Sequence, residues 1–194
     1  MSYLELFLGP MFSGKTSKLI DLYNKYTYCN MKVCVINHSL DTRYSETKLS
    51  SHDKMVIPCI FMNHLSDIYY YSNLEDPMDV KGQHHLLIHK SEVVLINEGQ
   101  FFDDLYEIVL KLLEENKKVY ISGLDGDFQK NKFGKLLDLI PHCDKVTKLE
   151  SLCGICKDGT KGIFSKRITQ ETDQKVIGVD NYIPVCRKCF NINI

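Results

Sequence analysis

Short apolar runs alternate with helical patterns along the first 149 residues of the chain. Five runs have the length of buried strands: 3–8, 32–37, 93–98, 119–122 and 145–149. Apolar residues at helical spacing follow the first and third runs, over 16–28 and 105–116. Apolar strands separated by helices are typical of a parallel sheet with helices packed on its faces. The pattern therefore predicts an α/β fold with a parallel sheet flanked by helices.

The predicted elements carry further signals on their faces and at their ends. In the first run, Leu4, Leu6 and Leu8 fall on one face because strand side chains alternate. The pair Asp103–Asp104 is a predicted cap for the helix over 105–116. Three lysines near the end of that helix are expected to complement its dipole: Lys111, Lys117 and Lys118.

The segment 55–90 gives the weakest pattern in the chain. Residues 56–61 suggest an edge strand because Pro58 cannot donate a ladder hydrogen bond. Residues 69–85 suggest a long irregular excursion, with Gly82 among its breakers. Three histidines in this region invite a metal site, although no nearby ligand of matching chemistry completes it: His84, His85 and His89.

The stretch between the first strand and the first helix fits the phosphate-binding pattern G-x-x-x-x-G-K-[ST]. It consists of Gly9, Pro10, Met11, Phe12, Ser13, Gly14, Lys15 and Thr16. A strand that turns through glycines into a helix directs backbone N–H groups and the positive helix end at one point. In that geometry Lys15 reaches the β- and γ-phosphates, and the Thr16 hydroxyl binds Mg²⁺. The alternative is a chance match in a glycine turn.

Polar residues follow the other predicted strands, at the edge of the sheet where ligands of α/β proteins bind. Asp41 and Arg43 come after the second strand, where a solvated loop is the alternative. Asn97 stands where a P-loop protein usually has an acidic Mg²⁺ partner, and it brings no charge. Glu98 is available as a general base. Phe128 and Phe133 follow the fourth strand, either to stack on a base or to pack in a core.

The C-terminal part contains two C-x-x-C pairs among the eight cysteines of the chain: Cys153 with Cys156, and Cys186 with Cys189. Four thiolates bind one Zn²⁺ tetrahedrally and leave no open position, which indicates a structural zinc. The 29 residues between the pairs exceed the commonest spacing, so this segment is expected to be ordered in its own right. Disulfides are the alternative, and a reducing compartment argues against them.

Length and charge restrict the function classes. The 194 residues suit one domain with a small appendage, which we predict as a nucleotide-binding domain over 1–149 and a zinc-binding lobe over 150–194. A net charge of -1 gives no general reason to expect a nucleic-acid or membrane partner. No apolar run approaches the roughly 18 residues of a membrane span. We expect a soluble, cytoplasmic protein.

These motifs together resemble the thymidine kinases of the cellular and poxvirus type. The resemblance rests on 9–16, 41–44, 52–53, 98–102, 124–129 and the two cysteine pairs. It implies ATP-dependent phosphorylation of the 5′-hydroxyl of thymidine, with Mg²⁺ and a structural Zn²⁺, in a homotetramer. It also implies Glu98 as the base for the 5′-hydroxyl. The phosphate donor then contacts the P-loop together with Asp41, Arg43, Asn97 and Gln100.

The resemblance further implies a nucleoside site built from two groups of residues. Around the thymine ring it places Met11, Phe101, Leu124, Phe128 and Phe133. A loop that closes over the nucleoside corresponds to Gln174, Lys175, Val176, Ile177 and Gly178, followed by Tyr182, and 165–167 resembles its start.

This chain departs from the family pattern in three places. Asn97 replaces the usual Asp, Gly178–Val179 replaces a pair of glycines, and the segment between Asp53 and Val93 is longer than usual. Asn97 leaves open a catalytically impaired, nucleotide-binding relative. A third alternative is a zinc-ribbon nucleic-acid binder that uses Arg187 and Lys188, against which the near-zero net charge argues.

Overall fold

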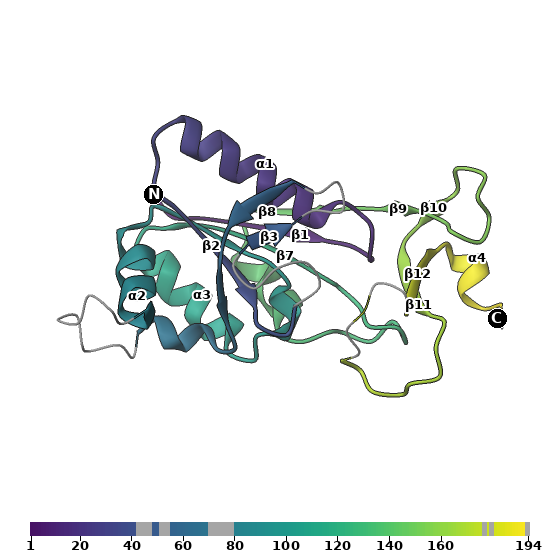
Figure 1. Ribbon diagram of the computed structural model, residues 1–194. Coiled ribbons are helices and arrows are strands. Elements are labelled where there is room, and N and C mark those ends of the chain that lie inside the picture. Colours follow the sequence, from purple (N-terminus) through teal and green to yellow (C-terminus); the bar gives the residue numbers. More distant parts are fainter. Residues whose placement is uncertain (42–47, 51–54, 70–79, 176–177, 179–180, 193–194) are drawn as a thin grey trace.

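The computed structural model describes residues 1–41, 48–50, 55–69, 80–175, 178 and 181–192. A six-stranded sheet with all neighbouring strands parallel forms its centre, in the order β5-β2-β6-β7-β1-β8 (Figure 1). Its strands are β1 (Tyr3–Leu8), β2 (Val33–His38), β5 (Ile60–Met62), β6 (Val93–Ile96), β7 (Lys118–Gly123) and β8 (Lys145–Lys148). The predicted parallel α/β fold is confirmed.

Helices cover both faces of this sheet (Figure 1). Helix α1 (Lys15–Tyr28) packs on one face, and α2 (Val80–Lys90), α3 (Leu105–Glu114) and two 3₁₀ helices, η1 (Leu65–Ile68) and η3 (Leu136–His142), pack on the other. Leu4, Leu6 and Leu8 lie in the core under α3, whereas Phe7 lies in the core under α1. The predicted alternation of the first strand is therefore confirmed.

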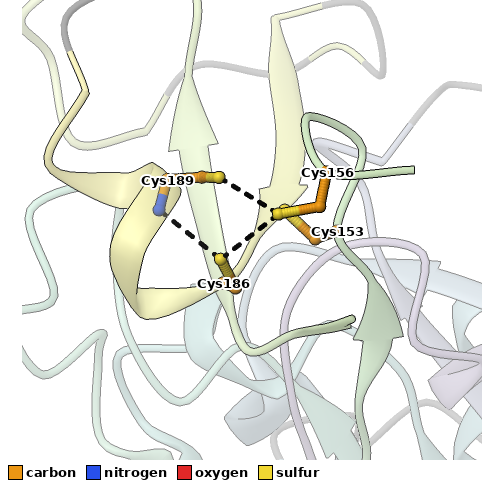
Figure 2. A group of neighbouring side chains, drawn as sticks. All are labelled: Cys153, Cys156, Cys186 and Cys189. Carbon is orange, nitrogen blue, oxygen red and sulfur yellow. Dashed lines mark hydrogen bonds between the residues drawn. The ribbon is translucent and has the colours of Figure 1, made fainter. Parts of the chain in front are cut away.

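Two small antiparallel pairs and a short helix form the C-terminal part of the chain. They are β9 (Ser151–Leu152) with β10 (Lys161–Gly162), β11 (Phe164–Arg167) with β12 (Tyr182–Val185), and α4 (Arg187–Phe190). The four cysteines of the C-x-x-C pairs point toward one another here (Figure 2). The boundary at residue 150 stays a prediction.

The predicted edge strand over 56–61 is two strands. Residues Val56–Pro58 form β4, which pairs antiparallel with β3 (Lys48–Ser50). Ile60–Met62 form β5, the edge strand next to β2. Pro58 is the last residue of β4, which agrees with a proline that ends regular pairing.

The predicted irregular excursion over 69–85 is wrong at its C-terminal end, because α2 begins at Val80 and includes Gly82. A glycine inside a helix costs about 1 kcal/mol relative to alanine. Tertiary packing offsets a cost of this size, since Ile88 of α2 is fully buried in the core together with Leu65 and Ile68.

Asp104 does not cap its own helix, contrary to the prediction. It precedes α3, but its carboxylate accepts hydrogen bonds from the backbone N–H groups of Leu65 (3.1 Å) and Ser66 (2.7 Å). These residues begin η1, whose first N–H groups lack partners within the helix. The carboxylate therefore stabilises a helix 38 residues away in the sequence.

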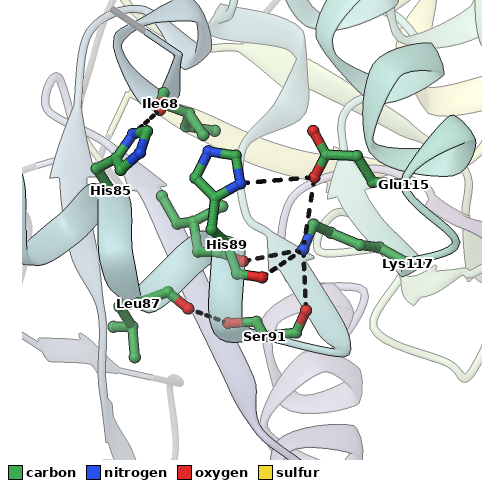
Figure 3. Close-up of polar contacts among 8 residues, drawn as sticks. Ile68, His85, Leu87, His89, Ser91, Glu115 and Lys117 are labelled. Atoms are coloured by element: carbon green, nitrogen blue, oxygen red, sulfur yellow. Dashed lines mark hydrogen bonds and ion pairs between the residues drawn. The ribbon is translucent and has the colours of Figure 1, made fainter. Parts of the chain in front are cut away.

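Lys117 also acts on a different helix from the one predicted. Its ammonium group donates to the carbonyls of Ile88 (3.1 Å), His89 (3.1 Å) and Ser91 (3.0 Å), at the C-terminal end of α2 (Figure 3). The last carbonyls of a helix have no partner within it and carry the negative end of its dipole. Lys117 thus complements α2 rather than α3.

Among the described residues, no helix is long and apolar enough to cross a membrane.

Candidate active site

The predicted phosphate-binding stretch forms a tight loop between β1 and α1. Gly9 has a φ of 152°, and a Cβ there would lie 2.5 Å from the carbonyl oxygen of Leu149, so the site requires glycine. Helix α1 begins at Lys15, whose ammonium donates to the carbonyl of Pro10 (2.7 Å). The Ser13 hydroxyl donates to the same carbonyl at 2.8 Å. Strand, loop and helix N-terminus thus have the order and geometry of an anion-binding site.

Polar side chains meet this loop from neighbouring strands. The Thr16 hydroxyl at the start of α1 lies 3.4 Å from Oδ1 of Asn97, which follows β6. Ser122 of β7 donates to the same oxygen at 2.7 Å. Asp41 is buried and accepts a hydrogen bond from the Asn37 amide, while its predicted partner Arg43 lies outside the described residues. The sheet therefore places Thr16, Asn97 and Asp41 in one connected group.

Glu98 is held in an uncommon backbone conformation next to this group. Its φ of 53° and ψ of 43° are left-handed, a region that non-glycine residues rarely adopt and that is frequent at functional sites. The Glu98 carboxylate accepts a 2.6 Å hydrogen bond from the fully buried Gln100 amide. The side-chain oxygen of Gln100, Oε1, in turn accepts a hydrogen bond from the backbone N–H of Leu124. Glu98 is thus oriented by a buried neighbour that also fixes the loop after β7.

Gly123 makes room for this arrangement. A Cβ at Gly123 would lie 2.5 Å from the Gln100 Oε1 atom and 2.5 Å from a Leu136 methyl group. Any larger residue there would displace the side chain that orients Glu98.

Aromatic rings gather around Phe101, three residues after Glu98. Phe101 packs edge-on against Phe133, with ring centroids 5.6 Å apart, and against His38 at 5.7 Å. Burial, followed by the charge of Lys175, lowers the pKa of His38, so its ring favours the neutral form. Sequence reasoning missed His38, although its place at the end of β2 is a signal that could have found it.

Arg167 organises the first part of the predicted nucleoside loop. Its guanidinium lies 3.7 Å from the centre of the Phe128 ring and donates to the Tyr182 hydroxyl. It also donates to the carbonyls of Glu171 (2.8 Å) and Asp173 (2.6 Å). One buried cation therefore ties the loop to two of the aromatic residues assigned to the nucleoside site.

Two further hydrogen bonds join this part of the chain to loops that follow strands of the main sheet. The backbone N–H of Met11 donates to the Ser165 hydroxyl (2.9 Å), which links the phosphate loop to β11. The Gln174 amide donates to Asp127 at 2.7 Å. Val176 and Ile177 lie outside the described residues. The structure thus brings the predicted loop to the segment after β7, through the bond from Gln174 to Asp127 and the packing of Arg167 on Phe128.

The four cysteine sulfur atoms lie within 4.8 Å of one another (Figure 2). Sγ of Cys156 is 3.4 Å from that of Cys189 and 3.8 Å from that of Cys186, and all four thiols are free of disulfides. Four thiolates at about 2.3 Å from a tetrahedral zinc stand about 3.8 Å apart, so these distances fit a zinc ion. The cluster can hold a metal ion such as zinc.

The surroundings of Cys153 favour a thiolate. Burial raises its pKa, but backbone N–H groups of Cys156, Cys186 and Ile155 outweigh that effect and lower the pKa of the thiol to about 6. Metal ligation by cysteine requires the thiolate form.

Comparison with known proteins agrees with this geometry. The family model described as thymidine kinase matches residues 2–190. Thymidine kinase 1 of Dictyostelium discoideum is 35% identical over 196 residues, covering 97% of this chain and 77% of the relative. Thymidine kinase a of Arabidopsis thaliana is 35% identical, covering 98% and 75%. The thymidine kinase of Variola virus is 37% identical over 190 residues, covering 97% and 96%. The chain belongs to the thymidine kinase family, which includes cellular and poxvirus members.

Proposed function

We propose that this protein transfers the γ-phosphoryl group of ATP to the 5′-hydroxyl of thymidine. Membership of the thymidine kinase family supports the nucleoside and the reaction class. The observation that carries the proposal is the meeting of two features at one edge of the sheet. The phosphate loop ends at Lys15, and Glu98 lies next to Asn97, whose side chain contacts Thr16.

The phosphate loop binds the donor in this proposal. Backbone N–H groups at the start of α1 and the Lys15 ammonium hold the phosphates and offset the charge that develops during transfer. The Thr16 hydroxyl and the Asn97 carbonyl oxygen are neutral oxygen ligands of the kind that Mg²⁺ accepts, either directly or through its waters. When bound, Mg²⁺ would neutralise charge on the phosphates of the donor.

Glu98 acts as the general base. Its carboxylate accepts the proton of the 5′-hydroxyl as the hydroxyl oxygen bonds to the γ-phosphorus and the bond from that phosphorus to ADP breaks. The buried amide of Gln100 restricts the carboxylate to one orientation, so the proton acceptor is in place before the nucleoside arrives. Arg43 joins Asp41 on the donor side in this proposal.

The nucleoside lies between the aromatic residues and the C-terminal loop. Phe101, Phe133 and Phe128, with Met11 and Leu124, enclose the base. Residues 174–178 and Tyr182 close over it, and Arg167 holds the start of this loop. A structural zinc on the four cysteines would join the turn that follows β9 to the start of α4 after β12. A homotetramer in the cytoplasm stays a prediction.

The proposal is tested with Glu98→Gln and with Glu107→Gln, an exposed glutamate on α3, as the matched control. Loss of a general base lowers turnover by about 10²-fold or more. We expect that loss for Glu98→Gln with thymidine and ATP affinities kept, and an unchanged rate for Glu107→Gln. Full turnover by Glu98→Gln would show that another group takes the proton.

Asn97 supports a second candidate, a nucleotide-binding relative with impaired catalysis, because it brings no charge to the donor site. The discriminating result is binding of ATP and thymidine to the natural protein without any transfer of phosphate.

A further inference from the structure

Three buried polar side chains form a row across neighbouring strands beneath the phosphate loop. Asn37 on β2 is 2% exposed, Asn97 after β6 is 2% exposed and Ser122 on β7 is 1% exposed. The strand order β2-β6-β7 places them side by side. Buried polar groups without hydrogen bonds are costly, so the partners of this row determine how each side chain is oriented.

The orientation of the row is set from one end. Asp41 presents a carboxylate, which only accepts hydrogen bonds, so the Asn37 amide turns its Nδ2 toward it at 3.1 Å. The Asn37 Oδ1 atom must then point the other way. It accepts from the backbone N–H of His38 (3.1 Å) and from Nδ2 of Asn97 (3.0 Å).

The same argument determines the orientation of the Asn97 side-chain amide. Because its Nδ2 is committed to Asn37, its Oδ1 faces the phosphate loop. That oxygen accepts from Ser122 at 2.7 Å and lies 3.4 Å from the Thr16 hydroxyl. An Asn97 with the opposite orientation would direct its NH₂ group at Thr16 and repel a cation there.

We propose that Asn37 is a positioning residue of the kinase, which acts through Asn97 to direct a carbonyl oxygen at the Mg²⁺ side of the phosphate site. Asp41 anchors Asn37 in the orientation that this requires. The inference rests on the proposed function, because it assigns Mg²⁺ to the neighbourhood of Thr16. It explains how a neutral residue at position 97 can present an oxygen to Mg²⁺. The Nδ2 donor of Asn97 meets the Oδ1 acceptor of Asn37, which leaves Oδ1 of Asn97 facing the phosphate loop.

The pairing has a consequence for Asn97→Asp. The second carboxylate oxygen would face Oδ1 of Asn37, an atom that only accepts, across the present 3.0 Å contact. A flip of Asn37 would relieve this contact, but it would turn Oδ1 toward the Asp41 carboxylate and break the bond from His38 N–H. The surroundings of position 97 therefore do not accommodate a carboxylate when Asn97→Asp is the only change.

The test measures how ATP affinity depends on Mg²⁺, by calorimetry, so that it needs no turnover. Asn37→Leu removes the amide with little change in size, and Asn24→Leu, on the exposed side of α1, is the control. We expect Asn37→Leu to raise the Mg²⁺ concentration for half-maximal ATP binding by about tenfold, the effect of one ordinary hydrogen bond. ATP binding without Mg²⁺ should not change. Asn37→Ser carries the same expectation if Asn37→Leu does not fold.

Two further variants show whether Asn37 acts through Asn97. In an Asn97→Ala background, Asn37→Leu should change the Mg²⁺ requirement by less than about twofold, because coupled residues are not additive. Asn97→Asp alone should not tighten the Mg²⁺ dependence. An unchanged Mg²⁺ requirement in Asn37→Leu, additive effects in the double variant, or tenfold tighter Mg²⁺ dependence in Asn97→Asp would each overturn the inference. Failure of phosphate transfer in the natural protein would instead refute the proposed function, since ATP binding is measured separately.

Discussion

Replacement of Arg167 by methionine should weaken thymidine binding without affecting the donor site. The guanidinium is held in the fold by stacking on Phe128, and it bonds the carbonyls of Glu171 and Asp173. Methionine keeps much of the side-chain length and removes every one of these hydrogen bonds. Residues 171–173 would then lose the cation that their backbone carbonyls contact.

The structure gives the size of the effect. Glu171 and Asp173 are exposed, so water replaces part of each lost bond, and a net value of about 1 kcal/mol per bond applies. Loss of the stacking on Phe128 adds about 0.5–1 kcal/mol. The sum of about 2.5–3 kcal/mol is the extra cost of ordering the loop, and the apparent thymidine affinity falls by the corresponding factor of about 70–150.

The assay is calorimetric titration with thymidine and, separately, with ATP and Mg²⁺. Arg187→Met is the matched control, because Arg187 is an exposed arginine on α4 in the same part of the chain. We expect thymidine affinity to fall only in Arg167→Met, ATP affinity to stay within twofold, and Arg167→Lys to lie between. Thymidine affinity within twofold of the natural protein in Arg167→Met would refute this role of Arg167. An equal loss of ATP affinity would show general unfolding instead.

Two other predictions concern the metal and the pH. Cys153→Ser should lose zinc and thymidine binding together while ATP binding remains, because structural zinc is coupled to folding. Zinc analysis beside calorimetry checks this prediction. Loss of zinc with intact thymidine affinity would contradict it. Burial and then His85, which lies beside His89 in Figure 3, lower the pKa of His89, so the folded protein favours the neutral ring. Stability should therefore fall as the pH drops below about 6.5, and less steeply in His89→Gln. Melting curves from pH 5 to 8 test this. The same dependence of melting temperature on pH in the natural protein and in His89→Gln would contradict the prediction.

The hydrophobic pattern predicted the main sheet well because each buried parallel strand is a short apolar run of its own. Strand β6 is buried on both faces along its whole length, and β1, β2 and β7 are buried at every residue but the first. The P-loop and the cysteine pairs were equally visible, since their chemistry depends on residues close together in the sequence. Helix α2 was missed because Gly82 and its polar neighbours hide its periodicity.

Partners chosen across the fold were not predictable in this way. Asp104 and Lys117 stand beside α3 in the sequence, yet they stabilise η1 and α2. Asn37 reads as the polar end of a strand until the sheet order places it next to Asn97. A sequence pattern shows which residues need a partner, whereas the topology decides which partner they find.

The most direct test of the central claim follows labelled γ-phosphate from ATP to thymidine in the presence of Mg²⁺. The natural protein should produce thymidine 5′-monophosphate that carries the label, and Lys15→Met, which loses the cation of the phosphate loop, should produce almost none. Absence of labelled product from natural protein that still binds ATP and thymidine would contradict the account.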